Sequence, residues 1–264
     1  MNPLWIPLLA VLLVGIPHGA LDAILIRKVS GSRSTLWFYG SYLLLCLAVI
    51  AIWFQAPVVS LAVFLMISLW HFGGADARGY GEDSWLSRIV HGAMIPIVLP
   101  ALQPEAVTPL FQLVALENQT PFVDWAQNLI GVWAGLVLLK FFRQEFQLRE
   151  FLELAGLCLF FWLADPLYSF ALYFCGLHSV RHFQQSFRYL SRNHFGKREL
   201  IEFATLSGIP VLMILLGGSL MNGTDWIQGL TGAVFIGLAA LTVPHMILID
   251  GWVPLGKTRP DHST

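Results

Sequence analysis

The chain is a succession of long apolar runs joined by short polar connections, and the apolar positions are continuous rather than alternating. Such runs are typical of transmembrane α-helices, which need about 20 apolar residues to cross a bilayer. A transmembrane β-barrel would instead show alternating segments of about 10 residues. The pattern predicts an all-α, polytopic transmembrane helix bundle with about nine spans, eight being the alternative count. The expected spans lie near residues 3–26, 34–54, 57–77, 87–103, 122–141, 149–165, 167–189, 200–220 and 229–252.

One interval, residues 104–121, interrupts this rhythm. It carries Pro104, Pro109 and Pro121, which predict a loop with one short interfacial helix. No repeat or linker divides the rest, so we expect residues 1–264 to form a single integral-membrane domain. The first apolar run has no basic segment before it, and we therefore expect it to be a retained span rather than a signal peptide.

The basic residues give the spans a direction. Lys and Arg follow the first, third, fifth, seventh and ninth spans, whereas the connections after the second, fourth, sixth and eighth contain none. Because cytoplasmic loops carry the excess of Lys and Arg, we expect the N-terminus outside and the C-terminus in the cytoplasm. This topology describes a multi-pass protein of the cell inner membrane. Of the 15 basic residues, only Arg181 lies in the interior of an expected span.

Composition excludes two broad classes of protein. The chain is 56% hydrophobic and 12% charged, whereas soluble domains are about 25% charged. A net charge of −1 offers no electrostatic footprint for nucleic acid. The three cysteines, Cys46, Cys158 and Cys175, lie in apolar runs without CxxC spacing and are expected to be small core residues.

Six of the eight histidines fall in expected spans, where an ionisable side chain is costly and is usually functional or partnered. The other two, His194 and His262, fall in a basic loop and in the tail and are expected to be solvated. His178 and His182 are four residues apart, so a helix places both on one face. Two neutral imidazoles at this spacing can bind one metal ion together.

Two more histidines are expected at the same depth in the membrane as His178 and His182. At ~1.5 Å per residue, His18 lies roughly 13 Å from the basic residue that ends its span, and His71 roughly 10 Å. On the same scale His178 and His182 lie about 15 and 9 Å from theirs. Four histidines from three spans therefore share one layer, which indicates a common metal site. The alternative is four separate core histidines bound to backbone carbonyls.

Acidic residues follow two of these histidines by about one helical turn. Asp22 comes four residues after His18, and we expect it to accept the second ring N–H of that histidine. Asp76 comes five residues after His71 in a similar setting of small residues. Both acids are expected to lie next to the metal-binding histidines and to orient their rings without binding the metal themselves.

Three further residues are candidates around this layer. Arg181 is expected to pair with a buried acid such as Asp22 or Asp76, a structural role as much as a catalytic one. His91 opens the fourth span near the cytoplasmic face. His245 lies in the last span and could be a fifth ligand, a partner of the ligands or a substrate contact.

Imidazole ligands without thiolates suit iron, copper or zinc better than calcium or magnesium. Aromatic residues flank the histidine spans, as an apolar tunnel for a substrate that reacts with O₂ would require, although ordinary helix packing explains any single ring equally well. A di-iron desaturase needs about eight clustered histidines, and a retinal-binding rhodopsin needs a mid-span lysine that this chain lacks. A membrane b-type cytochrome and a proton-coupled transporter that uses the intramembrane histidines and acids remain as alternatives.

An ordered set of short motifs resembles the Brp/Blh family of bacterial and archaeal integral-membrane β-carotene 15,15′-dioxygenases. Any one of these motifs alone would be weak, but they follow the order of the family from the first span to the last. They are Pro17-His18-Gly19-Ala20-Leu21-Asp22, His71-Phe72-Gly73 followed by Ala75-Asp76, His91-Gly92, His178-xx-Arg181-His182 and Pro244-His245-Met246.

The resemblance implies O₂-dependent cleavage of the central double bond of all-trans-β-carotene to two molecules of all-trans-retinal, so that residues 1–264 would be one carotenoid-cleaving domain. It also implies Fe(2+) held by four histidines, which map by motif onto His18, His71, His178 and His182. β-Carotene and O₂ would be the substrates, the lipid bilayer the surroundings, and a rhodopsin the acceptor of retinal.

Overall fold

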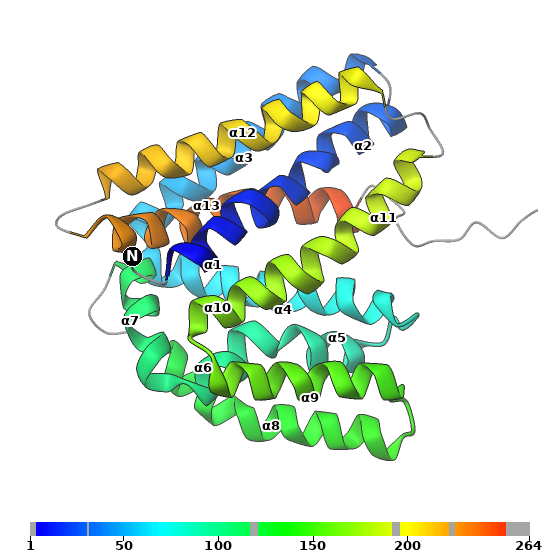
Figure 1. The fold of residues 1–264 in the computed structure, drawn as a ribbon, viewed down its shortest axis with the longest axis vertical. Helices are drawn as coiled ribbons and strands as arrows, with labels where there is room; N and C mark the ends of the chain where they lie inside the picture. The colour runs from blue at the N-terminus through cyan, green and yellow to red at the C-terminus, as the bar shows by residue number, and fades with distance from the viewer. Residues whose placement is uncertain (1–3, 31, 117–120, 192–195, 222–224, 252–264) are drawn as a thin grey trace, which may run out of the picture.

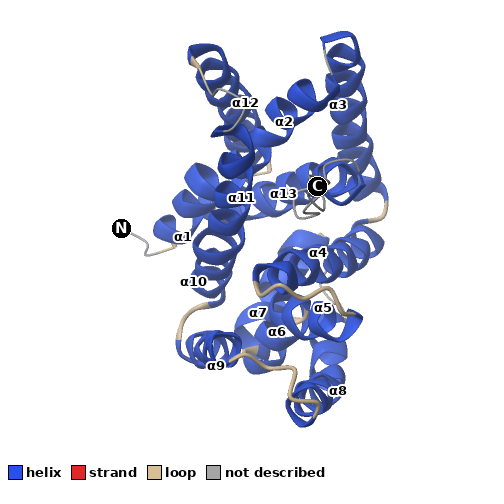
Figure 2. Cartoon of the chain, turned by 90° about the vertical axis from the view of Figure 1, so that its right-hand side faces the viewer, coloured by secondary structure: helices blue, strands red, loops and turns tan. Residues whose placement is uncertain are grey.

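The computed structural model describes residues 4–30, 32–116, 121–191, 196–221 and 225–251. Within these ranges every element of regular structure is a helix (Figures 1 and 2). The helices are α1 (Trp5–Ala10), η1 (Val11–Gly15), η2 (Ile16–Gly19), α2 (Ala20–Ser30), α3 (Ser32–Gln55), α4 (Pro57–Gly79), α5 (Trp85–Gly92), η3 (Met94–Val98), α6 (Leu99–Leu102), α7 (Pro104–Ala115), α8 (Phe122–Phe142), α9 (Leu148–Leu163), α10 (Pro166–Ala171), η4 (Leu172–Ser179), α11 (Val180–Ser191), α12 (Lys197–Leu220) and α13 (Trp226–Gly251).

The first and last long helices lie at the centre of the bundle. In the candidate span Trp5–Leu25, 72% of the most apolar stretch is buried, and in Trp226–Ile247 the share is 61%. Only 6% is buried in Lys197–Leu220 and 11% in Trp37–Gln55. Figures 1 and 2 show why, since α3 and α12 lie at one end of the bundle and α8 and α9 at the other, with α4, α11 and α13 between them.

The outer helices expose large apolar side chains. Trp37 is 82% exposed, Phe142 77% and Leu220 86%. Exposed apolar residues on this scale would be a liability in water, but they are what a helix facing lipid tails requires. The exposed surface therefore agrees with an integral-membrane protein.

Helices occupy all nine predicted regions, but fewer of them qualify as spans. Among the described residues, six helical stretches are long and apolar enough to cross a membrane, or seven if α5 and the η3–α6 segment, which are bent by 42°, form one broken span. The predicted span 149–165 corresponds to α9, whose 16 residues extend about 24 Å, short of the ~30 Å hydrocarbon core. The predicted span 167–189 corresponds to α10, η4 and α11, and its second half is polar. The number of spans and the orientation of the termini stay predictions.

The interval 104–121 contains the short helix expected there. The helix is α7, which begins at Pro104 and includes Pro109. Proline fits the first helical position because the N–H it lacks would have no partner inside the helix. Residues 117–120 lie outside the described part of the chain.

Helices α4 and α5 approach closely enough to exclude side chains between them. A Cβ on Gly73 would collide with the backbone carbonyl oxygen of Arg88, and one on Gly92 would collide with that of Leu69. Small residues are how membrane helices bring their backbones together. The contact fixes the end of α4 that carries His71.

Candidate metal centre

Five histidine rings meet in the middle of the bundle. They come from five different helical segments, and each histidine is at most 7% exposed. The five are His18 on η2, His71 on α4, His178 on η4, His182 on α11 and His245 on α13.

The rings contact one another edge to face. The ring centre of His18 lies 5.5 Å from that of His178 and 5.3 Å from that of His182. The ring centre of His245 lies 5.2 Å from that of His18 and 5.1 Å from that of His182. His71 closes the group at 5.2 Å from His178 and 5.0 Å from His245. The four histidines predicted from depth are therefore in one cluster, and His245 has joined them.

The cluster contains two groups of three residues, and in each group the ligand atoms lie close enough together to hold a metal ion. His18, His178 and His245 form one group, and Asp22, His182 and His245 form the other, with ligand atoms within 4.8 Å of each other in each. Both ring nitrogens of His178 and Nε2 of His245 are buried without a hydrogen-bond partner among the described residues. Buried nitrogen atoms in this condition are costly unless a ligand satisfies them.

The position of His18 depends on a local change of helix type. The π-helical segment η1 is followed by the 3-10 segment η2, in which Pro17 precedes the histidine. In η2 the ring Nδ1 bonds to the carbonyl of Gly15, three residues earlier. A neutral imidazole that donates from Nδ1 leaves Nε2 as its available ligand atom.

The expected bond between His18 and Asp22 is wrong. The prediction assumed 3.6 residues per turn, whereas η2 has the tighter winding of about 3 per turn, so a residue four positions later is no longer on the same face. The fully buried Asp22 carboxylate contacts other histidines instead. Its Oδ2 lies 2.5 Å from Nδ1 of His245, and its Oδ1 lies 3.5 Å from Nε2 of His182. Asp22 is thus a partner of the site, but of different members.

His178 also lies in a π-helical segment, η4, which passes into α11 just before His182. Segments of π-helix are rare and frequently occur at functional sites. Sequence patterns that assume a regular α-helix do not reveal them, which is why the detailed directions of His18 and His178 were not predictable.

Arg181 pairs with Asp76, as predicted. The guanidinium Nη1 donates to Asp76 Oδ1 at 2.6 Å, and Nη2 donates to Glu153 at 2.5 Å. The hydroxyl of Tyr173 donates to the other oxygen of Asp76 at 2.5 Å. Glu153 on α9 was not predicted, because it lies outside the histidine motifs from which the expected acidic partners came. Asp76 therefore holds Arg181 in place, one residue away from His182.

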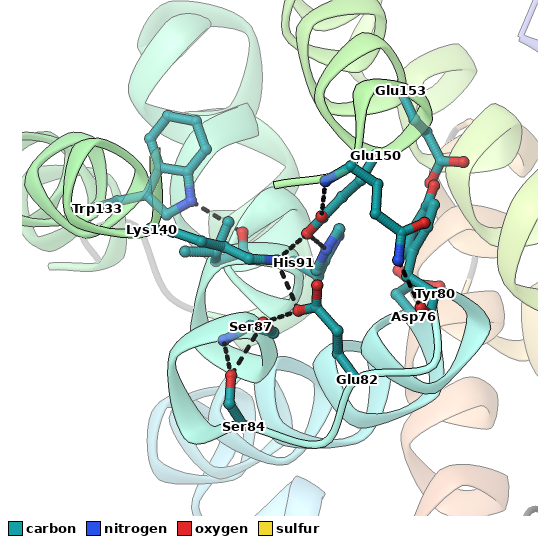
Figure 3. A network of polar contacts seen from close by, with 12 residues as sticks. Asp76, Tyr80, Glu82, Ser84, Ser87, His91, Trp133, Lys140, Glu150 and Glu153 are labelled. Carbon is teal, nitrogen blue, oxygen red and sulfur yellow. Dashed lines mark hydrogen bonds and ion pairs between the residues drawn. The ribbon is translucent and has the colours of Figure 1, made fainter. Parts of the chain in front are cut away.

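His91 belongs to a different network, on the α8–α9 side of the bundle (Figure 3). Its Nε2 lies 2.7 Å from Glu150, and its ring stacks on Tyr80. Glu150 also binds the fully buried Lys140, whose ammonium group lies 2.7 Å from Glu82. These contacts join α5, α8 and α9, so His91 has partners that account for its burial. His194 and His262 lie outside the described residues.

Aromatic rings cover one side of the histidine cluster. The ring centre of Phe72 lies 4.6 Å from that of His178, and the ring of Phe174 is stacked on His178 at 5.9 Å. Phe170 continues the stack at 5.3 Å from Phe174. This aromatic wall, Phe72, Phe170 and Phe174, makes the surroundings of the imidazoles apolar.

The fold and the cluster together define a helical membrane protein with a buried, imidazole-rich candidate metal centre. Residues 9–253 match the family model described as β-carotene 15,15′-dioxygenase. The chain therefore belongs to the β-carotene 15,15′-dioxygenase family, as the resemblance of the motifs predicted, and is an enzyme of the dioxygenase class.

Two curated relatives cover nearly the whole chain. The protein called β-carotene 15,15′-dioxygenase from the uncultured marine bacterium 66A03 is 37% identical over 93% of this chain and 92% of its own length. The protein called probable β-carotene 15,15′-dioxygenase Blh from Halobacterium salinarum is 24% identical over 92% of this chain and 82% of its own length. No solved structure gives a significant match.

Proposed function

We propose that this protein cleaves the central 15,15′ double bond of all-trans-β-carotene to two molecules of all-trans-retinal, in a reaction that depends on iron(II) and O₂. The observation that carries the proposal is the cluster of five buried imidazoles in a chain 37% identical to a β-carotene 15,15′-dioxygenase. Imidazole clusters suit a redox metal, and the relative's name supplies the substrate.

The donor set fits a ferrous ion. Neutral imidazole is a good ligand for iron, and the unpartnered ring nitrogens of His178 are buried where a ligand is required. His18, His71, His178 and His182 would hold the ion. When bound there, ferrous iron supplies the activation of O₂ that cleavage of a polyene needs.

The protein's own side chains orient the substrate and exclude water. Phe72, Phe170 and Phe174 offer flat apolar surfaces beside His178 against which a conjugated polyene can pack. Placing only the central double bond next to the imidazoles restricts the reaction to one bond. The lipid bilayer is the expected source of the apolar substrate, and a rhodopsin is the expected acceptor of retinal.

The b-type cytochrome is disfavoured by the packing of the cluster. A haem needs two axial histidines with a porphyrin between them, whereas these rings contact one another at centre distances of 5.0 to 5.5 Å. The transporter alternative explains the buried acids, but no observation favours it over an enzyme of this family.

Expression in a bacterium that accumulates β-carotene tests the proposal. We expect loss of carotenoid colour with formation of retinal, measured by chromatography. Replacing His18, His71, His178 or His182 with Ala should abolish both iron retention and retinal formation, whereas His91→Gln should retain both. Full activity in any of the four Ala variants would contradict its assignment as a ligand, and a haem absorption band in the purified protein would favour the cytochrome.

A further inference from the structure

His245 lies in the last described helix, α13, and its ring is placed where it could bind a metal ion. It belongs to both groups whose ligand atoms lie within 4.8 Å of each other. Its ring contacts three of the four histidines assigned above, namely His18, His71 and His182. It is 4% exposed.

The two nitrogens of His245 have different surroundings. Nδ1 lies 2.5 Å from the carboxylate of Asp22, so it is the nitrogen that carries the proton and donates it in a hydrogen bond. Nε2 is then the acceptor of the ring, and it is buried with no hydrogen-bond partner among the described residues. A carboxylate that orients a histidine in this way is the usual arrangement behind metal-bound imidazole.

His91 is a useful comparison, because it is a buried histidine whose hydrogen bond to Glu150 accounts for its burial. His91 is 2% exposed, and its Nε2 is satisfied by Glu150. His245 uses its carboxylate partner on Nδ1 and keeps Nε2 open. Both histidines are buried, but of the two only His245 has an available ligand atom beside other imidazoles.

We propose that His245 is a fifth imidazole ligand of the metal, bound through Nε2 and oriented by the hydrogen bond from Nδ1–H to Asp22. The inference rests on the proposed function, since it concerns the same iron. Five imidazoles leave one position fewer for an exogenous ligand than four would. Asp22 acts as a positioning residue, because its carboxylate accepts the Nδ1–H bond and so fixes the orientation of the His245 ring.

The test measures metal binding rather than turnover. Full-length protein is purified in detergent, stripped of metal and titrated without oxygen with Fe(II) and, separately, with Co(II). His245→Gln should weaken Fe(II) binding at least tenfold and alter the visible bands of bound Co(II), because the coordination number falls. Asp22→Asn should weaken binding by about 10-fold, because the amide oxygen still accepts the Nδ1–H bond but lacks the charge. The matched control, His91→Gln, should change neither quantity.

Each outcome decides a different question. Unchanged affinity and unchanged Co(II) bands in folded His245→Gln overturn the proposal. In that case a separate assay of β-carotene cleavage would identify His245 as a substrate contact if KM alone changed. If this variant does not fold, X-ray absorption of metal-loaded wild-type protein decides, since five imidazole ligands support the proposal and four overturn it. Wild-type protein that binds neither metal refutes the proposed function itself, whereas tight wild-type binding without any effect of His245→Gln refutes only the fifth ligand.

Discussion

Arg181 holds two acidic side chains together beside the histidine cluster. Its guanidinium binds Asp76 on α4 and Glu153 on α9, and Nη2 also donates to the Tyr80 hydroxyl at 3.2 Å. Three helices are thereby joined at the base of the histidine cluster. Removing the cation would leave two mostly buried carboxylates without their counter-ion, and an uncompensated buried charge strongly destabilises the folded state.

Arg181→Met should therefore lower the free energy of unfolding by about 3 to 5 kcal/mol. The measurement is the midpoint of thermal unfolding in detergent, followed by circular dichroism. Arg143→Met is the control, because Arg143 pairs with Glu145 but its side chain is 53% exposed, and such pairs contribute about 0 to 1 kcal/mol. Equal loss in the two variants would contradict the structural role given to Arg181.

At this scale the sequence predicted four of the five histidines that meet, but not how their rings are oriented. Counting from basic residues placed His18, His71, His178 and His182 at one depth, because depth depends only on rise along a helix. Which face a side chain occupies depends on winding, and the π and 3-10 segments near His18 changed it. His245 could not be ranked among its three possible roles, because its partner Asp22 lies 223 positions away in the chain.

At the scale of helices, the contact of α4 with α5 controls the position of His71. Gly73→Ala would place a methyl group against the carbonyl oxygen of Arg88, so the two helices must separate. We expect a lower midpoint of unfolding together with loss of bound iron, because His71 is two residues away. Overpacking of this kind costs typically about 1 to 3 kcal/mol. Iron content by mass spectrometry and the unfolding midpoint measure the two effects.

Gly135→Ala in α8 is the matched control, since a Cβ there would meet open space. It should leave iron content unchanged and raise stability slightly, by up to about 1 kcal/mol, because alanine is the better helix former. Retained iron and stability in Gly73→Ala would show that the backbone contact is looser than the structure has it.

The helices themselves were largely predictable, because a long apolar run in a membrane has few alternatives to a helix. Their role as spans was less so. Residues 149–165 and 167–189 are helical, yet α9 is short. The second half of 167–189 carries Arg181 and His182, whose side chains contact buried acids inside the bundle. Hydropathy averages over a window and cannot separate a helix that crosses the membrane from one that packs inside the bundle.

At the scale of the molecule, the distribution of basic residues predicts an external N-terminus and a cytoplasmic C-terminus. A C-terminal fusion to green fluorescent protein should fluoresce in a bacterial host, and a fusion to alkaline phosphatase should be inactive. The opposite pair of results would invert the topology or change the span count by one.

Labelling of single cysteines tests whether α9 crosses the membrane. In a background without Cys46, Cys158 and Cys175, a membrane-impermeant thiol reagent added to whole cells should label Ala164→Cys but not Gln144→Cys. This outcome follows from nine spans with the N-terminus outside. Equal reactivity at the two positions would mean that α9 does not cross.

The hydrogen bond between Asp22 and His245 joins the beginning of the described chain to its end. A ribosome that adds 5 to 20 residues per second makes the second of these residues about 10 to 45 s after the first. During that interval His18 and His71 have already been made, but α13, the helix that carries His245, has not. The histidine cluster is therefore incomplete until α13 has been made, so a metal ion bound in the proposed way could reach its final ligand set only after that helix has packed into the bundle.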